Sequence, residues 1–144
     1  MRVYLDNCCF NRPFDDQHHI RVRLEAEAKL DVQARIEAGE LDLIWSYILD
    51  YENAASPFEE RRELIAKWKE HAEMDLSETP AILEKAMEIQ AKGIRSKDAL
   101  HVACAIEAKA VYFLTTDDPI LTKLSDLQDI KVVDPTEFIR RLDQ

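Results

Sequence analysis

The sequence contains 144 residues, with 19 Lys and Arg against 29 Asp and Glu, so its formal net charge is −10. This length predicts a single domain, residues 1–144, which can bury a core without disulfides or metals. Its two glycines, Gly39 and Gly93, are too few for a P-loop or a glycine-rich dinucleotide fingerprint. The acidity argues against broad nonspecific nucleic-acid binding, although a nucleic-acid enzyme with a local basic patch remains compatible with it.

Cysteine usage and hydropathy indicate the environment of the chain. Cys8, Cys9 and Cys104 form no CxxC pair and show no Cys/His ligand spacing. The longest apolar runs, such as Val102–Ile106, fall far short of the ~20 residues of a membrane span. The amino terminus has no signal-peptide core. These features predict a cytoplasmic protein with reduced thiols and no membrane contact.

The amino-terminal half alternates short apolar runs with helical patterns. A first strand at Arg2–Leu5 is followed by a polar turn that contains Pro13. The subsequent elements are a helix over 19–38 ended by Gly39, a strand over 41–45, a helix over 46–55 capped by Ser46, and a helix over 57–71.

The carboxyl-terminal half continues the same alternation. Thr79 and Pro80 open a helix that stops at Gly93, and Ser96 is expected to cap the next one. The elements predicted after that are a helix over 96–108, a strand over 111–114, a short helix over 119–124, a strand over 130–133 and a last helix from residue 135.

The strands are apolar throughout rather than alternating, and helices separate them. This pattern predicts a three-layer α/β/α sandwich around a parallel sheet of four to five strands. In such folds, ligands bind beyond the carboxyl ends of the strands. The side chains that follow each strand are therefore the first candidates for function.

Acidic side chains occupy several of these positions. Asp6 follows the first strand, Glu52 lies in the helix after the second, Asp98 lies in the first turn of its helix, and Asp117 and Asp118 follow the third strand. A single acid of this kind is commonly a cap or a turn residue. Two carboxylates ~4 Å apart repel by about 4 kcal/mol at an effective dielectric of 20, so a cluster favours a bound cation.

The chemistry of these side chains selects the cation. Carboxylate oxygens without Cys or His ligands suit Mg²⁺ or Mn²⁺. Water bound to such an ion gains acidity and can attack phosphorus, so phosphodiester hydrolysis is the natural reaction for such a cluster.

Four segments resemble the PIN-domain nucleases, in the right order and over nearly the whole chain. They are Val3–Asn7, Ser46 with Glu52, Lys97–Ala105 with its Asp-Ala-Leu-x-x-Ala-x-Ala pattern, and Phe113–Asp117. The resemblance implies a ribonuclease that uses Mg²⁺ or Mn²⁺. In many bacterial members it also implies the toxin of a toxin–antitoxin pair, of the VapC type.

The resemblance also implies roles for individual residues. The acids of the family fall on Asp6, Glu52, Asp98 and Asp117, with Asp118 as the alternative for the last, and the strand-end hydroxyl falls on Thr115. Asp6, Asp98 and Asp117 would hold the metal directly or through water. Glu52 would orient or deprotonate the attacking water, or join the metal shell.

One position departs from the family pattern. Many members carry Asn two residues after the first Asp, where this chain has Cys8. Asn7 either supplies the amide from a shifted position or stabilises the turn. The segment from Cys8 to Phe14 is not a family motif, so it leaves the choice of substrate open. His101 is expected to be a core residue or to support the site from behind.

The partners follow from the same resemblance. Arg12 lies near Asp6 in the sequence, and Arg95 and Lys97 come just before Asp98, so these basic side chains are candidates for RNA contacts. The resemblance implies a homodimer and an antitoxin protein. Two alternatives stay open: a catalytically silent PIN-like binding or scaffolding module, and another acid-site phosphotransfer enzyme. The latter has less support because the paired Asp and the Lys of receivers and phosphatases are missing.

Overall fold

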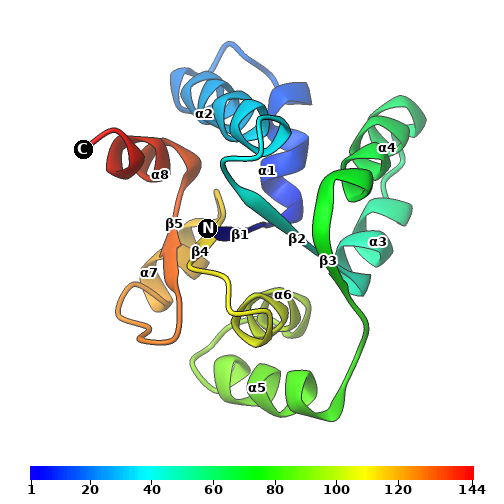
Figure 1. Ribbon diagram of the computed structural model, residues 1–144, viewed down its shortest axis with the longest axis vertical. Coiled ribbons are helices and arrows are strands. Elements are labelled where there is room, and N and C mark those ends of the chain that lie inside the picture. The colour runs from blue at the N-terminus through cyan, green and yellow to red at the C-terminus, as the bar shows by residue number, and fades with distance from the viewer.

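The computed structural model describes residues 1–144 and contains one five-stranded, all-parallel sheet (Figure 1). The strand order is β3-β2-β1-β4-β5, and every neighbouring pair is parallel. The strands are β1 (Arg2–Leu5), β2 (Asp42–Ser46), β3 (Ala72–Leu76), β4 (Tyr112–Leu114) and β5 (Lys131–Val133). The predicted α/β architecture with a parallel sheet is confirmed.

Helices cover both faces of the sheet. The α-helices are α1 (Asn7–Asn11), α2 (Ile20–Glu37), α3 (Tyr47–Ala54), α4 (Glu59–Ala66), α5 (Pro80–Gln90), α6 (Ser96–Glu107), α7 (Asp118–Lys123) and α8 (Pro135–Leu142). Two 3₁₀ segments, η1 (Arg12–Phe14) and η2 (Lys67–His71), extend α1 and α4. Helices α2 and α8 pack together on one face, and α5 and α6 pack together on the other (Figure 1).

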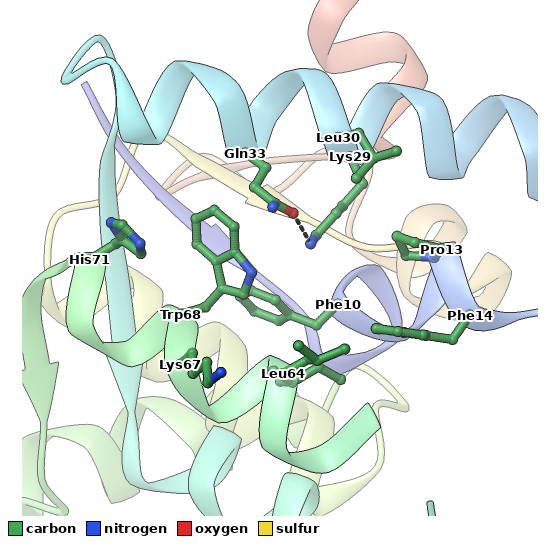
Figure 2. A pocket seen from close by; sticks show the side chains of 11 residues that line it. Phe10, Pro13, Phe14, Lys29, Leu30, Gln33, Leu64, Lys67, Trp68 and His71 are labelled. Atoms are coloured by element: carbon green, nitrogen blue, oxygen red, sulfur yellow. Dashed lines mark hydrogen bonds between the residues drawn. The ribbon is translucent and has the colours of Figure 1, made fainter. Parts of the chain in front are cut away.

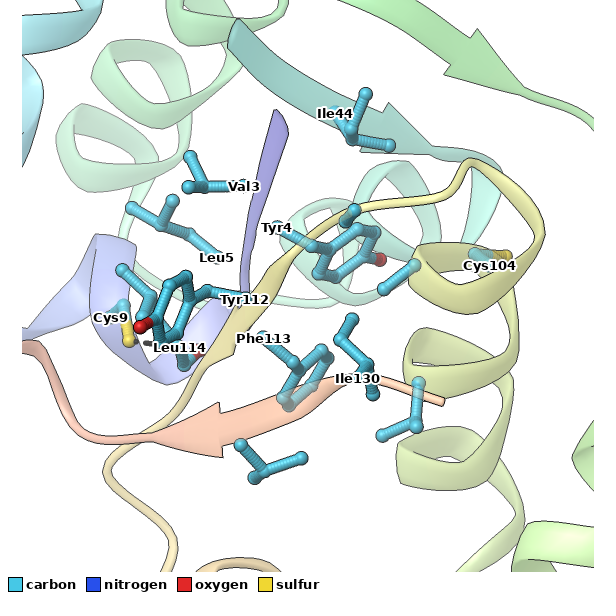
Figure 3. Packing of buried hydrophobic residues seen from close by; sticks show 14 of the residues in the cluster. Val3, Tyr4, Leu5, Cys9, Ile44, Cys104, Tyr112, Phe113, Leu114 and Ile130 are labelled. Atoms are coloured by element: carbon cyan, nitrogen blue, oxygen red, sulfur yellow. Dashed lines mark hydrogen bonds between the residues drawn. The ribbon is translucent and has the colours of Figure 1, made fainter. Parts of the chain in front are cut away.

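The core explains the apolar strands. Val3, Tyr4 and Leu5 of β1 are each at most 1% exposed, because this central strand has helices on both sides. Successive side chains point to opposite faces, so Val3 and Leu5 share a side with Cys9, whereas Tyr4 stacks on Phe113 on the α6 side (Figure 3). The centroids of the two stacked rings lie 5.4 Å apart.

Strand β3 was absent from the prediction. It lies at an edge of the sheet and pairs with β2 alone. In its sequence, Ala-Glu-Met-Asp-Leu, apolar and acidic residues alternate, and the acidic ones are exposed. Such a half-solvated strand resembles a polar linker more than it resembles the buried strands of this sheet.

Three predicted boundaries also change. The helix expected over 57–71 is α4 followed by the separate 3₁₀ segment η2. The polar turn after β1 contains the short helix α1, which Asp6 caps. The cap of α6 is Arg95, and Ser96 is the first helical residue. The turn that ends α2 is as expected, because Gly39 adopts a φ of 78°, which L side chains rarely adopt.

The switch point of the sheet topology lies between β1 and β4. From β1 the chain proceeds outward to β2 and β3, and it then returns to the other side of β1 for β4 and β5. In folds of this kind, ligands bind beyond the carboxyl ends of the strands at the switch point. None of the helices is both long and apolar enough to cross a bilayer.

Candidate metal centre

Asp6 lies at the carboxyl end of β1 and is 5% exposed. Its Oδ1 accepts a hydrogen bond of 2.8 Å from the backbone N–H of Asn7, which makes Asp6 the cap of α1. Its Oδ2 accepts a hydrogen bond of 2.9 Å from the Thr115 hydroxyl. These two bonds fix the carboxylate at the carboxyl ends of β1 and β4.

Thr115 connects the ends of β1 and β4. It follows β4 directly and is fully buried. Its hydroxyl donates to Asp6, and its oxygen accepts a hydrogen bond of 3.1 Å from the backbone N–H of Asp117. Asp117 in turn caps α7, because its Oδ1 accepts from the Ile120 N–H at 3.2 Å. One hydroxyl therefore ties two of the predicted acids to the same loop.

Asp98 is half-buried in the first turn of α6, facing the same region. Burial, followed in order of effect by the negative charges of Asp6, Asp117 and Glu52, raises its pKa from 3.8 to about 6. Because this repulsion weakens with distance, it indicates that the four predicted acids face a common space. Asp98 also lines two surface hollows, one shared with Glu52 and one shared with Asp117.

A buried hydrogen-bond chain holds Glu52. The Glu52 carboxylate lies 2.5 Å from Nε2 of His101, whose Nδ1 lies 2.5 Å from the Tyr4 hydroxyl. The Tyr4 hydroxyl lies 2.6 Å from Ser46 Oγ. His101, Tyr4 and Ser46 are fully buried, so water does not compete for these bonds. His101 thus supports the site from behind, in the role that the sequence suggested for it.

Electrostatics favour the positive form of His101 despite its burial. Desolvation lowers the pKa of the imidazole, but the Glu52 hydrogen bond and the nearby Asp6 charge outweigh it, and the net pKa is raised. Nε2 lies 3.8 Å from Asp6 Oδ1. His101 therefore faces two of the acids and offsets part of their mutual repulsion.

Other predicted residues lie near the site or serve the fold. Asn7 contributes its backbone N–H to Asp6, whereas its side-chain Oδ1 is buried without a hydrogen-bond partner. Asp118 is exposed and forms an ion pair of 2.8 Å with Arg21, so Asp117 is the acid on the Thr115 side.

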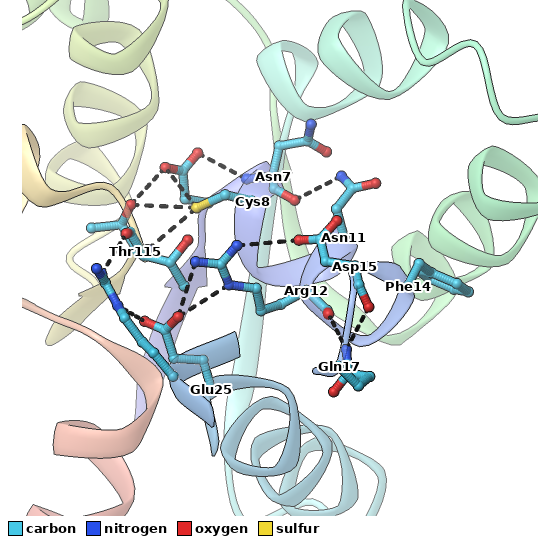
Figure 4. A network of polar contacts seen from close by, with 12 residues as sticks. Asn7, Cys8, Asn11, Arg12, Phe14, Asp15, Gln17, Glu25 and Thr115 are labelled. Atoms are coloured by element: carbon cyan, nitrogen blue, oxygen red, sulfur yellow. Dashed lines mark hydrogen bonds and ion pairs between the residues drawn. The ribbon is translucent and has the colours of Figure 1, made fainter. Parts of the chain in front are cut away.

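Arg12 forms two ion pairs in this structure. Its guanidinium pairs with Glu25 at 3.0 Å and with Asp15 at 3.2 Å, and only a fifth of the side chain is exposed. Figure 4 shows these pairs, which join η1 to Asp15 directly after it and to Glu25 of α2. The predicted contact of Arg12 with RNA stays a prediction. Arg95 and Lys97, by contrast, line the hollow that contains Glu52 and Asp98.

Cys8 is a residue of the site that sequence reasoning did not assign. Its Sγ lies 3.5 Å from Asp6 Oδ2 and 3.5 Å from Thr115 Oγ1, and it accepts from the Thr116 N–H at 3.3 Å (Figure 4). The signal was present in the sequence, since Cys8 occupies the position where the resembling family often has Asn. The thiol fills the space beside Asp6 and donates to its carboxylate.

The donor set fits Mg²⁺ or Mn²⁺ bound partly through water. No three Asp, Glu, His or Cys side chains are close enough to ligate one ion together. Mg²⁺ retains several waters and often uses only one or two carboxylates directly. Asp98 and the three acids around it supply hard oxygen donors and a negative field, which are what such an ion requires.

Comparisons with known proteins agree with this architecture. The family model for the PIN domain matches residues 3–127. A crystal structure of VapBC2 from Rickettsia felis, bound to a DNA fragment from their promoter, is similar in fold with a TM-score of 0.57 and 14% sequence identity. The match covers 92% of this chain and 97% of that chain. No curated protein matches this sequence significantly.

Proposed function

The chain belongs to the PIN-domain family, and on that premise we propose that residues 1–144 act as one Mg²⁺- or Mn²⁺-dependent ribonuclease domain. The observation that carries the proposal is the placement of Asp98, which lines one surface hollow with Glu52 and another with Asp117. Thr115 connects Asp117 to Asp6. Such concentrated negative charge is costly unless a cation or protons offset it. Phosphodiester hydrolysis is the reaction that suits a hydrated divalent ion at this position.

Each acid has a role in this proposal. Asp6, Asp98 and Asp117 hold the ion directly or through water. When bound, the ion makes a water more acidic and neutralises charge on the phosphate. Glu52 accepts the proton of the attacking water, and its carboxylate is oriented by the bond to His101. Thr115, Asn7 and Cys8 fix the orientation of Asp6.

The proposal also names a substrate and partners for the domain. Arg95 and Lys97 lie beside Asp98 and would pair with RNA phosphates. The similarity in fold to VapBC2 supports a toxin role with an antitoxin protein. This support comes from the fold alone, since only 14% of the aligned residues are identical. The homodimer in this proposal rests only on the family resemblance of the sequence.

A Mn²⁺ titration by calorimetry tests the metal centre, and a cleavage assay on mixed-sequence RNA tests the reaction. We expect saturable binding and metal-dependent cleavage in the wild type, both lost in Asp98→Asn and in Asp6→Asn. Asp118→Asn is the matched control, because this neighbouring acid is exposed and paired with Arg21. Full activity of folded Asp98→Asn would overturn the assignment. Metal binding without cleavage of any RNA would favour the silent binding module.

A further inference from the structure

A cavity of about 440 Å³ lies on the side of the molecule that holds η1, α2, α4 and η2. Phe10, Phe14, Leu64 and Trp68 supply most of its apolar wall (Figure 2). None of the four acids of the metal centre lines it, so it is a separate feature. Its volume falls in the range of cavities that bind small organic molecules.

Lys29 of α2 is a charged side chain inside this apolar wall. The residue is only 4% exposed, and its ammonium points toward the space between Trp68 and Phe10 (Figure 2). Nζ lies 2.5 Å from Gln33 Oε1, which is its one hydrogen-bond partner. It lies 5.3 Å and 5.2 Å from the ring centroids of Phe10 and Trp68.

The ammonium lacks a counter-ion in a chain that is rich in acids. No carboxylate forms an ion pair with Lys29, and no acidic residue lines the cavity. The remaining polar side chains of the wall are Gln33, Lys67 and His71. Burial lowers the pKa of Lys29 from 10.5 to about 8. A buried charge without an opposite charge is costly, and the two aromatic faces offset only part of that cost.

We propose that this cavity binds a small organic monocarboxylate. The carboxylate pairs with Lys29 Nζ, and the apolar body of the ligand packs against Trp68, Phe10 and Leu64. The one buried cation matches the single negative charge of a carboxylate, because Lys67, the other lysine of the wall, is exposed to solvent. The proposal is independent of the nuclease proposal, because the two sites share no residue.

The test is a titration of the full chain with octanoate and with 3-phenylpropionate. Binding is followed by Trp fluorescence and by amide chemical shifts in α1, α2 and α4. We expect one ligand per chain. Lys29→Met, which keeps the length and apolar stem of the side chain, should weaken binding roughly 10- to 100-fold, because a charge-assisted bond in a buried site is lost.

Two controls isolate the charge. Octanamide lacks the negative charge of octanoate, so it should bind the wild-type protein more weakly than octanoate does. This comparison needs no mutation and therefore holds even if Lys29→Met fails to fold. Lys92→Met removes an exposed lysine that does not line the cavity and should change binding less than about threefold. Absence of octanoate binding, equal binding of octanamide, or unchanged binding by folded Lys29→Met would overturn the proposal. Binding of an acidic peptide alone would overturn it in favour of a protein partner.

Discussion

At the scale of single residues, the surroundings of Asp98 disfavour the negative charge of its carboxylate. Its carboxylate is half-buried and faces three other acids, so its pKa is raised to about 6. Without a cation, each proton released from this region adds to the repulsion. A residue of this kind stabilises a bound ion at the cost of the stability of the metal-free fold, which is common at functional sites.

This arrangement predicts how Asp98→Asn changes stability with pH. The pKa of Asp98 is higher in the folded state, about 6, than its ordinary 3.8, so the folded state binds more protons between these values. The stability of the wild type therefore falls as the pH rises from about 4 to 6, and Asn removes that loss. At pH 7.5 in the presence of a chelator, Asp98→Asn should raise the free energy of unfolding by roughly 1–2 kcal/mol. Solvent screening keeps this gain below the value that the full pKa shift would give.

Urea denaturation at pH 3.5 and at pH 7.5 measures the difference, which should be near zero at the lower pH. Asp118→Asn is a control of opposite sign. Its hydrogen bond to Arg21 lowers the pKa of Asp118, so removing this carboxylate should not stabilise the protein at pH 7.5. A metal-free Asp98→Asn that is less stable than the wild type at pH 7.5 would show that the acids do not repel as described.

At the scale of elements, Tyr4 joins parts of the chain that are far apart in sequence. Its hydroxyl in β1 bonds Ser46 at the start of α3 and His101 in α6, and His101 continues to Glu52 of α3. No local pattern encodes these bonds, since they span 42, 97 and 49 residues. They align α3 and α6 at the carboxyl edge of the sheet.

Tyr4→Phe tests this connection. The substitution keeps the ring stacked on Phe113 but leaves Nδ1 of His101 without its hydrogen-bond partner. Ser46 Oγ loses this partner too but keeps its bond from the Leu49 N–H. We expect a loss of about 1–3 kcal/mol in the free energy of unfolding. Tyr51→Phe is the matched control: Tyr51 is 59% exposed, and the change should stay within ~0.5 kcal/mol. Equal effects of the two substitutions in urea denaturation would contradict the proposed role of the hydroxyl.

The difference between local sequence patterns and long-range contacts explains which elements the sequence could predict. Strands β1, β2, β4 and β5 are short apolar runs followed by turns, so periodicity and composition are enough to locate them. In edge strand β3, apolar residues alternate with acidic ones, and the five-residue helix α1 is too short to show a helical period. Strand β3 depends on its pairing with β2, and α1 depends on its cap, Asp6, rather than on local preference.

The residues of the candidate site also divide into those that the sequence could predict and those that it could not. The positions of Asp6, Asp98 and Asp117 relative to strand and helix ends are visible in the sequence, because parallel strands place their carboxyl ends together. The contacts of Cys8 with Thr115, the ion pairs of Arg12 and the burial of Lys29 are not visible. Each of these depends on the exact packing of segments that the sequence does not place relative to one another.

At the scale of the whole molecule, a chain of net charge −10 must attract RNA locally if it is a ribonuclease. Arg95 and Lys97 flank Asp98 at the carboxyl edge of the sheet, and Lys97 Nζ lies 5.2 Å from the centroid of the exposed Tyr51 ring. Attraction from so few cations is short-ranged, since the Debye length is ~8 Å at physiological salt. RNA binding should therefore depend on these side chains far more than on the total charge.

The double substitution Arg95→Gln and Lys97→Gln tests this localisation. Each phosphate contact on a single strand contributes about 0.7 to the slope of log affinity against log salt, so losing two should flatten the slope by roughly 1.4. The measurement is RNA affinity between 50 and 200 mM salt, conditions that resolve such slopes. A control pair, Lys109→Gln with Lys131→Gln, makes the same charge change near the starts of β4 and β5, at the opposite edge of the sheet. An equal change of slope in both pairs would mean that RNA responds to net charge and that the basic residues beside Asp98 do not guide it to the acids.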